Sequence, residues 1–232
     1  MDKYVIIVAG GSGVRMGSAI PKQFMLLDNQ PVLMHTILSF FQAGIENIIV
    51  VVPIPFIEYW KTICNTYSFN VPHKVVGGGL FRSQSVRNGL EVIDATEALV
   101  AVHDGVRPFV STETINQAFD TAQEYGTGVP YLDIRESLRQ IEGNESMHVD
   151  RDKYKSMQTP QCFTLAILRK VYNSPRLPSF TDDAALVEQM GIPITLFKGS
   201  EENIKITTPL DLHFAEAIIK SQKTASSFNL TS

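Results

Sequence analysis

The stretch Tyr4-Val5-Ile6-Ile7-Val8-Ala9-Gly10-Gly11-Ser12-Gly13 decides the fold class of this 232-residue chain. Its first part is a short β-branched apolar run, which is typical of a strand buried on both faces of a sheet. The glycines that follow allow backbone N–H groups to approach and cradle phosphate oxygens. This stretch therefore predicts an α/β protein whose first loop lies at the ligand-binding edge of its sheet.

Working outward, short apolar runs alternate with longer helical patterns. Besides Tyr4–Ala9, strands are expected over Asn47–Val52, His73–Val76 and Leu99–Val102. Helices are expected over Pro31–Phe41, Phe56–Tyr67 and Ser83–Ile93, and from Ser111 or Thr112 to Tyr125. Such alternation predicts a Rossmann-like, mostly parallel sheet with right-handed crossovers and helices on both faces. Ligands then bind beyond the carboxyl ends of the strands, in the loops after Ala9, Val76 and Val102.

The polar segment Asp133–Asp150 interrupts this alternation. A turn at Glu142–Asn144 with weak alternation on both sides predicts a projecting β-hairpin arm at about 133–150. A two-stranded ribbon cannot bury its own faces, which favours packing on another subunit, although the composition fits a mobile surface loop equally well. The remaining expected elements are helices over Leu165–Tyr172, Asp182–Met190 and Pro209–Lys220 and a strand over Ile192–Phe197. Residues 1–232 are expected to form one domain, with a disordered tail over Thr224–Ser232.

Composition excludes several classes of protein. With 20 Lys and Arg against 24 Asp and Glu, the net charge is −4, which disfavours non-specific binding of nucleic acid or of a membrane surface. No apolar run is long enough to span a membrane, and no secretory signal pattern is present. Cys64 and Cys162 are too far apart in the sequence for a CxxC pair, which disfavours a cysteine zinc site and fits a reducing compartment. We therefore expect a cytoplasmic protein.

The glycine loop fits neither of two common phosphate-binding motifs. It lacks the GxxxxGK[ST] spacing of a Walker A motif, and Met16 stands where a dinucleotide fingerprint needs its third glycine. What the loop does have is cations, because Arg15 follows it and Lys22 comes shortly after. An Arg fork and a Lys point charge beside a glycine loop suit a triphosphate on which charge develops, and this interpretation is favoured over a solvated surface Arg.

Polar residues follow the later strands as well. Asp104 comes directly after a predicted strand, where it is placed to hold magnesium or a polar substrate, although a carboxylate there also caps turns. Arg107 is placed to take a second anion, and His103 is interpreted as structural. The turn Gly77–Gly79, followed by Arg82, Ser83 and Ser85, offers backbone and hydroxyl groups for a nucleobase or ribose, or is simply a flexible turn with a helix cap.

Eight motifs in order carry a resemblance to a known family: AGGSGVRMG (9–17), PKQF (21–24), RSQSVRNGL (82–90), HDGVRPF (103–109), VDR (149–151), QTPQCF (158–163), TDDA (181–184) and NIKITTP (203–209). Together they resemble the 2-C-methyl-D-erythritol 4-phosphate cytidylyltransferase family, and they span nearly the whole chain. The resemblance implies a nucleotide-diphospho-sugar transferase type of fold. It implies transfer of a cytidylyl group from CTP to the phosphate of methylerythritol 4-phosphate, with magnesium required and pyrophosphate released.

The resemblance also implies roles for individual residues. Arg15 and Lys22 would stabilise the transition state, and Arg151 and Lys205 would position the attacking phosphate. Thr159 would lie near that phosphate, and Asp104 would lie by the metal and the polyol. In a homodimer whose arm crosses over, Arg107 and Ser137 would complete the partner's substrate pocket. The residues expected to bind the nucleotide are Ala9, Gly10, Gly11, Ser12, Gly13, Gly78, Gly79 and Ser85.

Two departures from the family pattern point to a sister activity. The opening Val8-Ala9-Gly10-Gly11 and the Gly105-Val106 pair also resemble ribitol-5-phosphate cytidylyltransferases, which would make CDP-ribitol. The arm motif Arg135-Glu136-Ser137-Leu138-Arg139 and the pair Asp182-Asp183 favour methylerythritol phosphate as the substrate. A nucleotide-sugar pyrophosphorylase and a nucleotide-binding regulator without turnover are more distant alternatives. The regulator is disfavoured because Arg15, Lys22 and Asp104 are all present.

Overall fold

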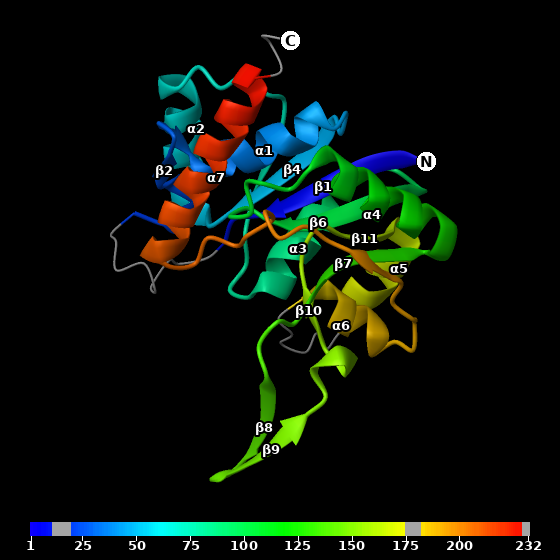
Figure 1. Ribbon diagram of the computed structural model, residues 1–232. Helices are drawn as coiled ribbons and strands as arrows, with labels where there is room; N and C mark the ends of the chain where they lie inside the picture. Colours follow the sequence, from blue (N-terminus) through cyan, green and yellow to red (C-terminus); the bar gives the residue numbers. More distant parts are fainter. Residues whose placement is uncertain (11–19, 175–181, 229–232) are drawn as a thin grey trace.

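The structure of the protein is a computed structural model that describes residues 1–10, 20–174 and 182–228 (Figure 1). One large sheet holds eight strands in the order β10-β7-β11-β6-β1-β4-β5, with β12 paired to β7. Their bounds are β1 Asp2–Val8, β4 Asn47–Val52, β5 Lys74–Gly77, β6 Ala98–Asp104, β7 Thr127–Asp133, β10 Lys155–Met157, β11 Gln161–Thr164 and β12 Leu196–Lys198. The strands β6, β1, β4 and β5 run parallel, so their carboxyl ends share one edge.

Helices cover both faces of this sheet, as the sequence predicts. Their bounds are α1 Val32–Gln42, α2 Ile57–Thr66, α3 Arg82–Glu91, α4 Thr112–Tyr125, α5 Leu165–Tyr172, α6 Asp183–Glu188 and α7 Pro209–Phe228. Short 3-10 turns lie at Lys22–Phe24, Ile54–Phe56 and Arg151–Lys153, and a small hairpin pairs β2 Leu26–Leu27 with β3 Gln30–Pro31. No helix within the described ranges is both long and apolar enough to cross a bilayer.

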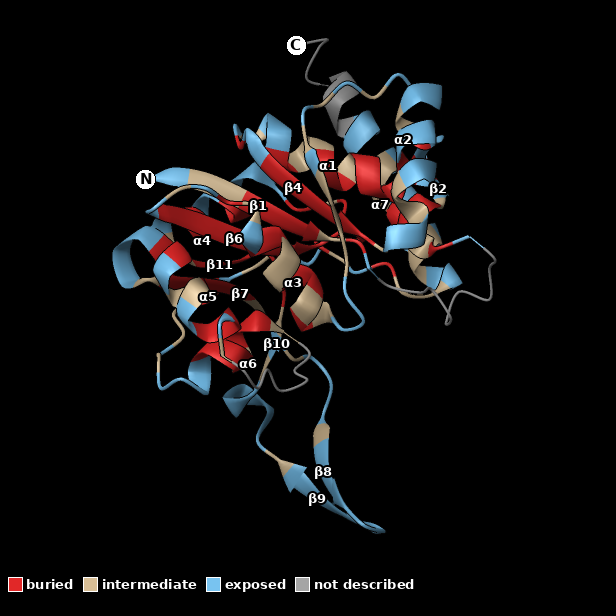
Figure 2. Ribbon diagram, turned by 180° about the vertical axis from the view of Figure 1, so that it is seen from behind, coloured by how far each residue is buried: buried red, intermediate tan, exposed pale blue. Residues whose placement is uncertain are grey.

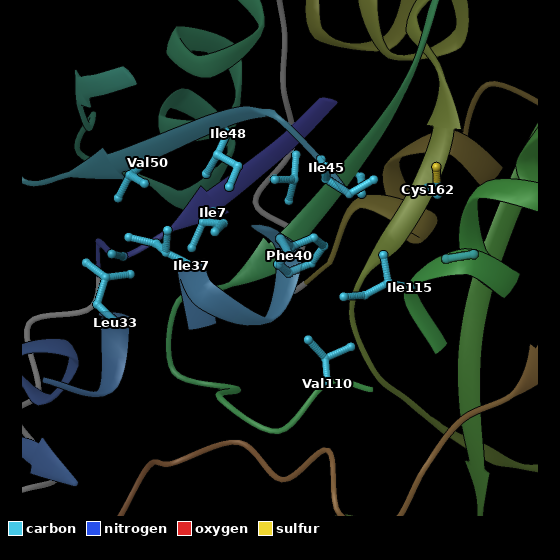
Figure 3. Packing of buried hydrophobic residues seen from close by; sticks show 14 of the residues in the cluster. Ile7, Leu33, Ile37, Phe40, Ile45, Ile48, Val50, Val110, Ile115 and Cys162 are labelled. Carbon is cyan, nitrogen blue, oxygen red and sulfur yellow. The ribbon is translucent and has the colours of Figure 1, made fainter. Parts of the chain in front are cut away.

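The core consists of two layers, one on each face of the sheet, and the first strand shows why. Val5 and Ile7 point into a cluster with α1, α2 and α4, whereas Ile6 points into a cluster with α3, α5 and α6. Side chains that alternate across a strand can be apolar throughout only when both faces are covered, which is what the unbroken run in β1 indicates. The buried strands form the centre of the molecule in Figure 2, and Figure 3 shows part of the first cluster.

One glycine sets the distance between a helix and the sheet. A Cβ atom on Gly89 of α3 would lie 2.8 Å from Cγ2 of Ile6 in β1. Contacts that short do not occur between real side-chain carbons, so only glycine allows α3 to pack this closely. The close approach brings the first residues of α3 to the edge where β1 and β6 end.

The arm is a two-stranded ribbon that projects from the body (Figure 1). Its strands β8 Leu138–Glu142 and β9 Glu145–Val149 pair antiparallel, and Gly143 at the predicted turn has a φ of 58°. Ile141 and Met147 are 67% and 56% exposed. The predicted hairpin is therefore confirmed, whereas its contact with a second subunit stays a prediction.

Several sequence-based boundaries were wrong. The strands β7, β10 and β11 were not predicted, and the last strand is confined to Leu196–Lys198 instead of Ile192–Phe197. Helix α7 continues to Phe228, so residues 224–228 of the expected disordered tail are helical, and 229–232 lie outside the described residues. The tail was misjudged because small polar residues are tolerated on a helix whose other turns are anchored. One anchor is the contact of Lys223 Nζ with Asp28 Oδ2 at 2.7 Å.

Candidate active site

A pocket of about 390 Å³ lies at the shared carboxyl edge of the parallel strands. Its walls come from the ends of β1 and β6, from the turn after β5, from the 3-10 turn at Lys22–Phe24 and from the loop before α7. The lining residues are Val8, Ala9, Gly10, Lys22, Gln23, Gly79, Leu80, Phe81, Arg82, Ser85, Asp104, Val106 and Lys205. The sequence thus located the pocket correctly, because three loops that it singled out meet there.

The start of the glycine loop is held from two sides. The N–H of Ala9 donates to the carbonyl of Val51 at 2.8 Å, and Gln23 Nε2 donates to the carbonyl of Ala9 at 2.6 Å. Gln23 is fully buried and belongs to the 3-10 turn that also carries Lys22. The same turn therefore fixes the loop and brings Lys22 to the pocket. The predicted residues Gly11, Ser12, Gly13 and Arg15 lie outside the described residues.

The turn after β5 forms the opposite wall. Ser85 Oγ accepts from the N–H of Gly79 at 3.2 Å and donates to the carbonyl of Phe81 at 3.2 Å, so the hydroxyl closes the turn. A Cβ at Gly79 would overlap Gln84, which makes glycine necessary there. Gly79 and Ser85 line the pocket, whereas Gly78 does not. The N–H of Gly78 donates to the carbonyl of Val52. The turn is therefore braced by Ser85, and no serine side chain caps α3, which begins without a side-chain cap after Phe81.

Asp104 is the electrostatic centre of the site. Its Oδ2 atom lies 3.0 Å from Lys205 Nζ and 3.1 Å from Arg107 Nε, and the residue is buried. Burial alone would raise the pKa of Asp104, but the charges of Lys205, Arg107 and Arg82 outweigh it and hold the pKa well below its usual range. Asp104 is therefore a carboxylate at every physiological pH. The three cations beside it outnumber this one negative charge, so the site also favours anionic ligands.

A second pocket, of about 300 Å³, adjoins the first. It shares Arg82, Asp104 and Lys205 with the first pocket. Its other lining residues are Arg107, Met157, Gln158, Thr159, Gln161 and Asp182. Two adjoining pockets that share charged residues can hold two ligands whose reacting groups meet beside those residues.

Arg107 belongs to the pocket of its own chain. Its Nη1 donates to the carbonyl of Asn203 at 2.7 Å, its Nε contacts Asp104, and the residue is only 9% exposed. The expectation that Arg107 completes the partner's pocket is therefore wrong. It failed because the two-residue spacer Gly105-Val106 turns the chain back, with the N–H of Arg107 donating to the carbonyl of Asp104 at 3.1 Å.

Thr159 lines the second pocket, but its proton is engaged elsewhere. The ring of the fully buried His103 places Nε2 3.1 Å from the carbonyl of Arg107 and Nδ1 3.0 Å from Thr159 Oγ1. A carbonyl only accepts, so Nε2 carries the ring proton and Thr159 donates to Nδ1. The N–H of Asp104 in turn donates to Thr159 Oγ1 at 3.1 Å. Thr159 thus fixes the backbone of Asp104, and its contact with substrate stays a prediction.

The ring of His103 is neutral, as this network requires. Burial lowers the pKa of His103 to about 4, although the carbonyl of Arg107 opposes this shift. The edge of the ring packs against Phe40, with 4.9 Å between the ring centroids. The structural role expected for His103 is therefore confirmed, and its consequence is a fixed hydroxyl orientation at Thr159.

Two expected site residues stay apart from these pockets. Ser137 and Arg151 flank the arm, both are exposed, and neither belongs to the residues that line the two pockets. Arg151 Nη1 donates to the carbonyl of Arg135, which ties the two ends of the arm together. One chain, as far as the structure describes it, does not bring Arg151 together with Lys205.

Sequence reasoning missed a charged group between the helices. Arg82 lines both pockets and pairs with the buried Asp183, with 2.6 Å between Nη2 and Oδ2. Tyr172 donates its hydroxyl proton to the other oxygen of Asp183. The signal was present in the RSQSV and TDDA motifs. However, the adjacent Asp182 accepts from the N–H of Ala185 as a helix cap, and sequence alone does not separate these two roles.

Metal binding would depend on Asp104. No group of three or more His, Cys, Asp or Glu residues suited to a metal occurs in the described part of the chain. Asp104 lines both pockets, and both of its ion pairs use Oδ2. Magnesium is commonly held by one or two carboxylates together with substrate phosphates, and the site fits that pattern.

Comparison with known proteins gives the family. Residues 3–221 match the family model described as 2-C-methyl-D-erythritol 4-phosphate cytidylyltransferase. Relatives of that name from Bacteroides thetaiotaomicron and Porphyromonas gingivalis are 45% and 47% identical, cover 94% of this chain and are themselves covered over 100% and 98%. The solved enzyme of that name from Thermus thermophilus is 31% identical, with a TM-score of 0.77 over 95% of this chain and 100% of that one. This chain therefore belongs to the 2-C-methyl-D-erythritol 4-phosphate cytidylyltransferase family.

Proposed function

We propose that this enzyme transfers the cytidylyl group of CTP to 2-C-methyl-D-erythritol 4-phosphate, giving CDP-methylerythritol and pyrophosphate. The observation that carries the proposal is the pair of adjoining pockets with Asp104, Lys205 and Arg82 in their common wall. The first pocket, beside the glycine loop and the Ser85 turn, is proposed to hold CTP. The second is proposed to hold the polyol, with its phosphate against Lys205.

The reaction needs positioning and charge rather than a base. A phosphate monoester is already ionised at neutral pH, so one of its oxygens attacks the α-phosphorus of CTP and the bond to the departing pyrophosphate breaks. Lys22 and Arg15 are proposed to neutralise the charge that develops there, and Lys205 and Arg151 to align the attacking phosphate. Lys22 lines the first pocket and not the second, whereas Lys205 lines both, which supports this division between donor and acceptor.

Asp104 has two proposed tasks. Its Oδ2 holds Lys205 and Arg107 in place, and its carboxylate would hold magnesium together with phosphate oxygens of CTP. When bound, the metal would neutralise phosphate charge. A permanently ionised Asp104 suits both tasks.

The arm supports a homodimer. Its exposed Ile141 and Met147 form no core of their own, and the expected site residues Ser137 and Arg151 lie apart from the pockets of the same chain. A second copy would cover the ribbon and receive these two residues at its own acceptor pocket. CTP and the polyol phosphate are thus the proposed small-molecule partners, and a second copy is the proposed protein partner. The expected location in the cytoplasm stays a prediction.

The choice of polyol rests on the relatives rather than on Asp183. Asp183 is fully buried against Arg82 and Tyr172, so it supports the fold and does not itself read the polyol. Relatives with 45–47% identity carry the methylerythritol name, which favours this substrate over ribitol 5-phosphate.

The test is pyrophosphate release from CTP and magnesium, with methylerythritol 4-phosphate and ribitol 5-phosphate in parallel. We expect a kcat/KM at least about 100-fold higher for methylerythritol 4-phosphate, because a pocket built around one polyol leaves polar groups unpaired with another. An enzyme without added polyol phosphate is the blank for CTP hydrolysis. A preference for ribitol 5-phosphate would overturn the proposed substrate and leave the cytidylyl transfer in place.

A further inference from the structure

Arg82 occupies an unusual place between the two pockets. It begins α3 directly after the glycine turn and belongs to the wall that both pockets share. Its side chain is 23% exposed, although the carboxylate that holds it is completely buried. One end of the guanidinium therefore faces the protein interior, and the rest is available to the pockets.

The interior end is fixed by a rigid acceptor. Asp183 Oδ2 accepts a hydrogen bond from Arg82 Nη2, and Asp183 Oδ1 accepts one from the hydroxyl of Tyr172. The backbone of Asp183 is fixed too, because its N–H and that of Ala184 donate to Gln161 Oε1 at 3.0 and 2.9 Å. Each oxygen of the carboxylate has a partner, so Asp183 holds the guanidinium in one orientation.

The donor count leaves Arg82 with unused capacity. A guanidinium has five N–H donors, and the bond to Asp183 uses one of them among the described residues. Burial alone would lower the pKa of Arg82, but the adjacent Asp183 outweighs burial and raises it, so the group stays protonated. A planar cation whose other N–H groups have no acceptor among the described residues matches the oxygens of a phosphate.

We propose that Arg82 binds phosphate oxygens of both reactants where the two pockets meet, and that Asp183 and Tyr172 act as positioning residues for it. This inference rests on the proposed cytidylyl transfer. As an oxygen of the acceptor phosphate bonds to the α-phosphorus and the bond to pyrophosphate breaks, the new diphosphate bridges the two pockets. Arg82 stays protonated and transfers no proton. Its guanidinium N–H groups donate hydrogen bonds to oxygens of both phosphoryl groups.

The competing interpretation is that Arg82 only ties α3 to α6. The chain offers a matched control, because Arg87 on the same helix makes a tie of that kind. Its Nε donates to the carbonyl of Tyr172 at 2.8 Å and its Nη2 to the carbonyl of Ser174 at 3.1 Å, and it lines neither of the two pockets. A structural role predicts similar behaviour for the two arginines.

The experiment compares Arg82→Lys and Arg87→Lys in the full-length enzyme. Steady-state kinetics with both substrates, calorimetric titration with CTP and thermal unfolding are measured for each variant. We expect Arg82→Lys to lower kcat/KM by about 100-fold, because Lys keeps the charge but loses the fork. Arg87→Lys is expected to lower the unfolding temperature with kcat/KM close to wild type. Equal kinetic losses in the two variants, or a loss in neither, would overturn the proposal.

The positioning role has its own test in Tyr172→Phe. This change keeps the ring but removes the proton donor to Asp183, so we expect a lower kcat with a nearly unchanged KM for CTP. A change in unfolding temperature alone would overturn the positioning role of Tyr172. Wild-type enzyme that fails to turn over methylerythritol 4-phosphate would defeat the proposed function instead. In that case weaker CTP binding by Arg82→Lys would still support the role of Arg82, and unchanged binding would overturn it.

Discussion

The strand-end pockets and the arm are opposites in burial. His103, Asp104 and Thr159 are 0, 7 and 5% exposed and hold one another through hydrogen bonds of 3.0 and 3.1 Å. The arm presents Ile141 and Met147 to solvent, and its strands contact each other far more than they contact the body. The difference indicates two ways of building a site. One half is fixed by the fold of a single chain, and the other half is proposed to be complete only when a second chain supplies it.

The largest expected effect separates these two halves. Lys22→Ala and Arg151→Ala should each lower kcat by about 100–1,000-fold, because each removes a cation that acts on a phosphate in the transition state. If Arg151 acts across a dimer, mixing the two variants creates one intact site per heterodimer. Activity should then recover to about a quarter of wild type at statistical mixing.

The control for that experiment is each variant mixed with itself under the same exchange conditions. Native mass spectrometry, with one variant carrying a tag that separates the masses of the two homodimers and the heterodimer, confirms that subunits have exchanged. No recovery despite proven exchange would place Arg151 in the site of its own chain. The proposal that a second chain completes the site would then be wrong.

The next effect concerns the buried half alone. His103 has a pKa of about 4 in the folded protein against about 6.5 when unfolded, so folding favours the neutral ring. The stability from this neutral ring is complete above pH 6.5 and is lost as the pH falls toward 4, by about 3 kcal/mol. Urea unfolding at several pH values measures this loss. His103→Asn should remove that part of the pH dependence, and an unchanged slope in the variant would contradict the prediction.

The smallest expected effect tests how Thr159 acts. Thr159→Ser keeps the hydroxyl that joins His103 to the N–H of Asp104, whereas Thr159→Val removes it and leaves the buried N–H unpaired. We expect near wild-type kcat for Ser and a loss of about tenfold for Val, accompanied by a lower unfolding temperature. Equal kinetics for the two variants would show that the hydroxyl does not position Asp104.

The first half of the chain was predictable because its signals are local. An unbroken apolar strand, a glycine loop and Lys22 lie within the first 22 residues, and the end of the strand, Gly10 and Lys22 meet at one pocket. Strands β7 and β11 were missed because Gly128 and Pro130 interrupt the first and the second has only four residues. β11 lies between the longer strands β6 and β7, and β7 pairs with three short strands, so the stability of both comes from pairings that a local pattern does not reveal.

The pairings in the site were less predictable for a similar reason. Nothing local to Arg82 indicates that Asp183, 101 residues later, will receive it. Arg107 was assigned to a partner by resemblance, yet its own turn folds it back onto Asp104. Residue types at strand ends predict which functional groups lie at one edge of the sheet. The partner of each side chain depends on how distant segments pack.

The antiparallel placement of β11 beside β6 also bears on the order of folding. It brings the start of β11 to the edge where β6 ends, so Thr159 reaches Asp104 across 55 residues of intervening chain that include the arm. During synthesis the walls at Ala9, Ser85 and Asp104 emerge first, and the acceptor side must wait for a long loop to close. Lys205 lines both pockets and is made later still, so neither pocket is complete on a growing chain until that residue has emerged.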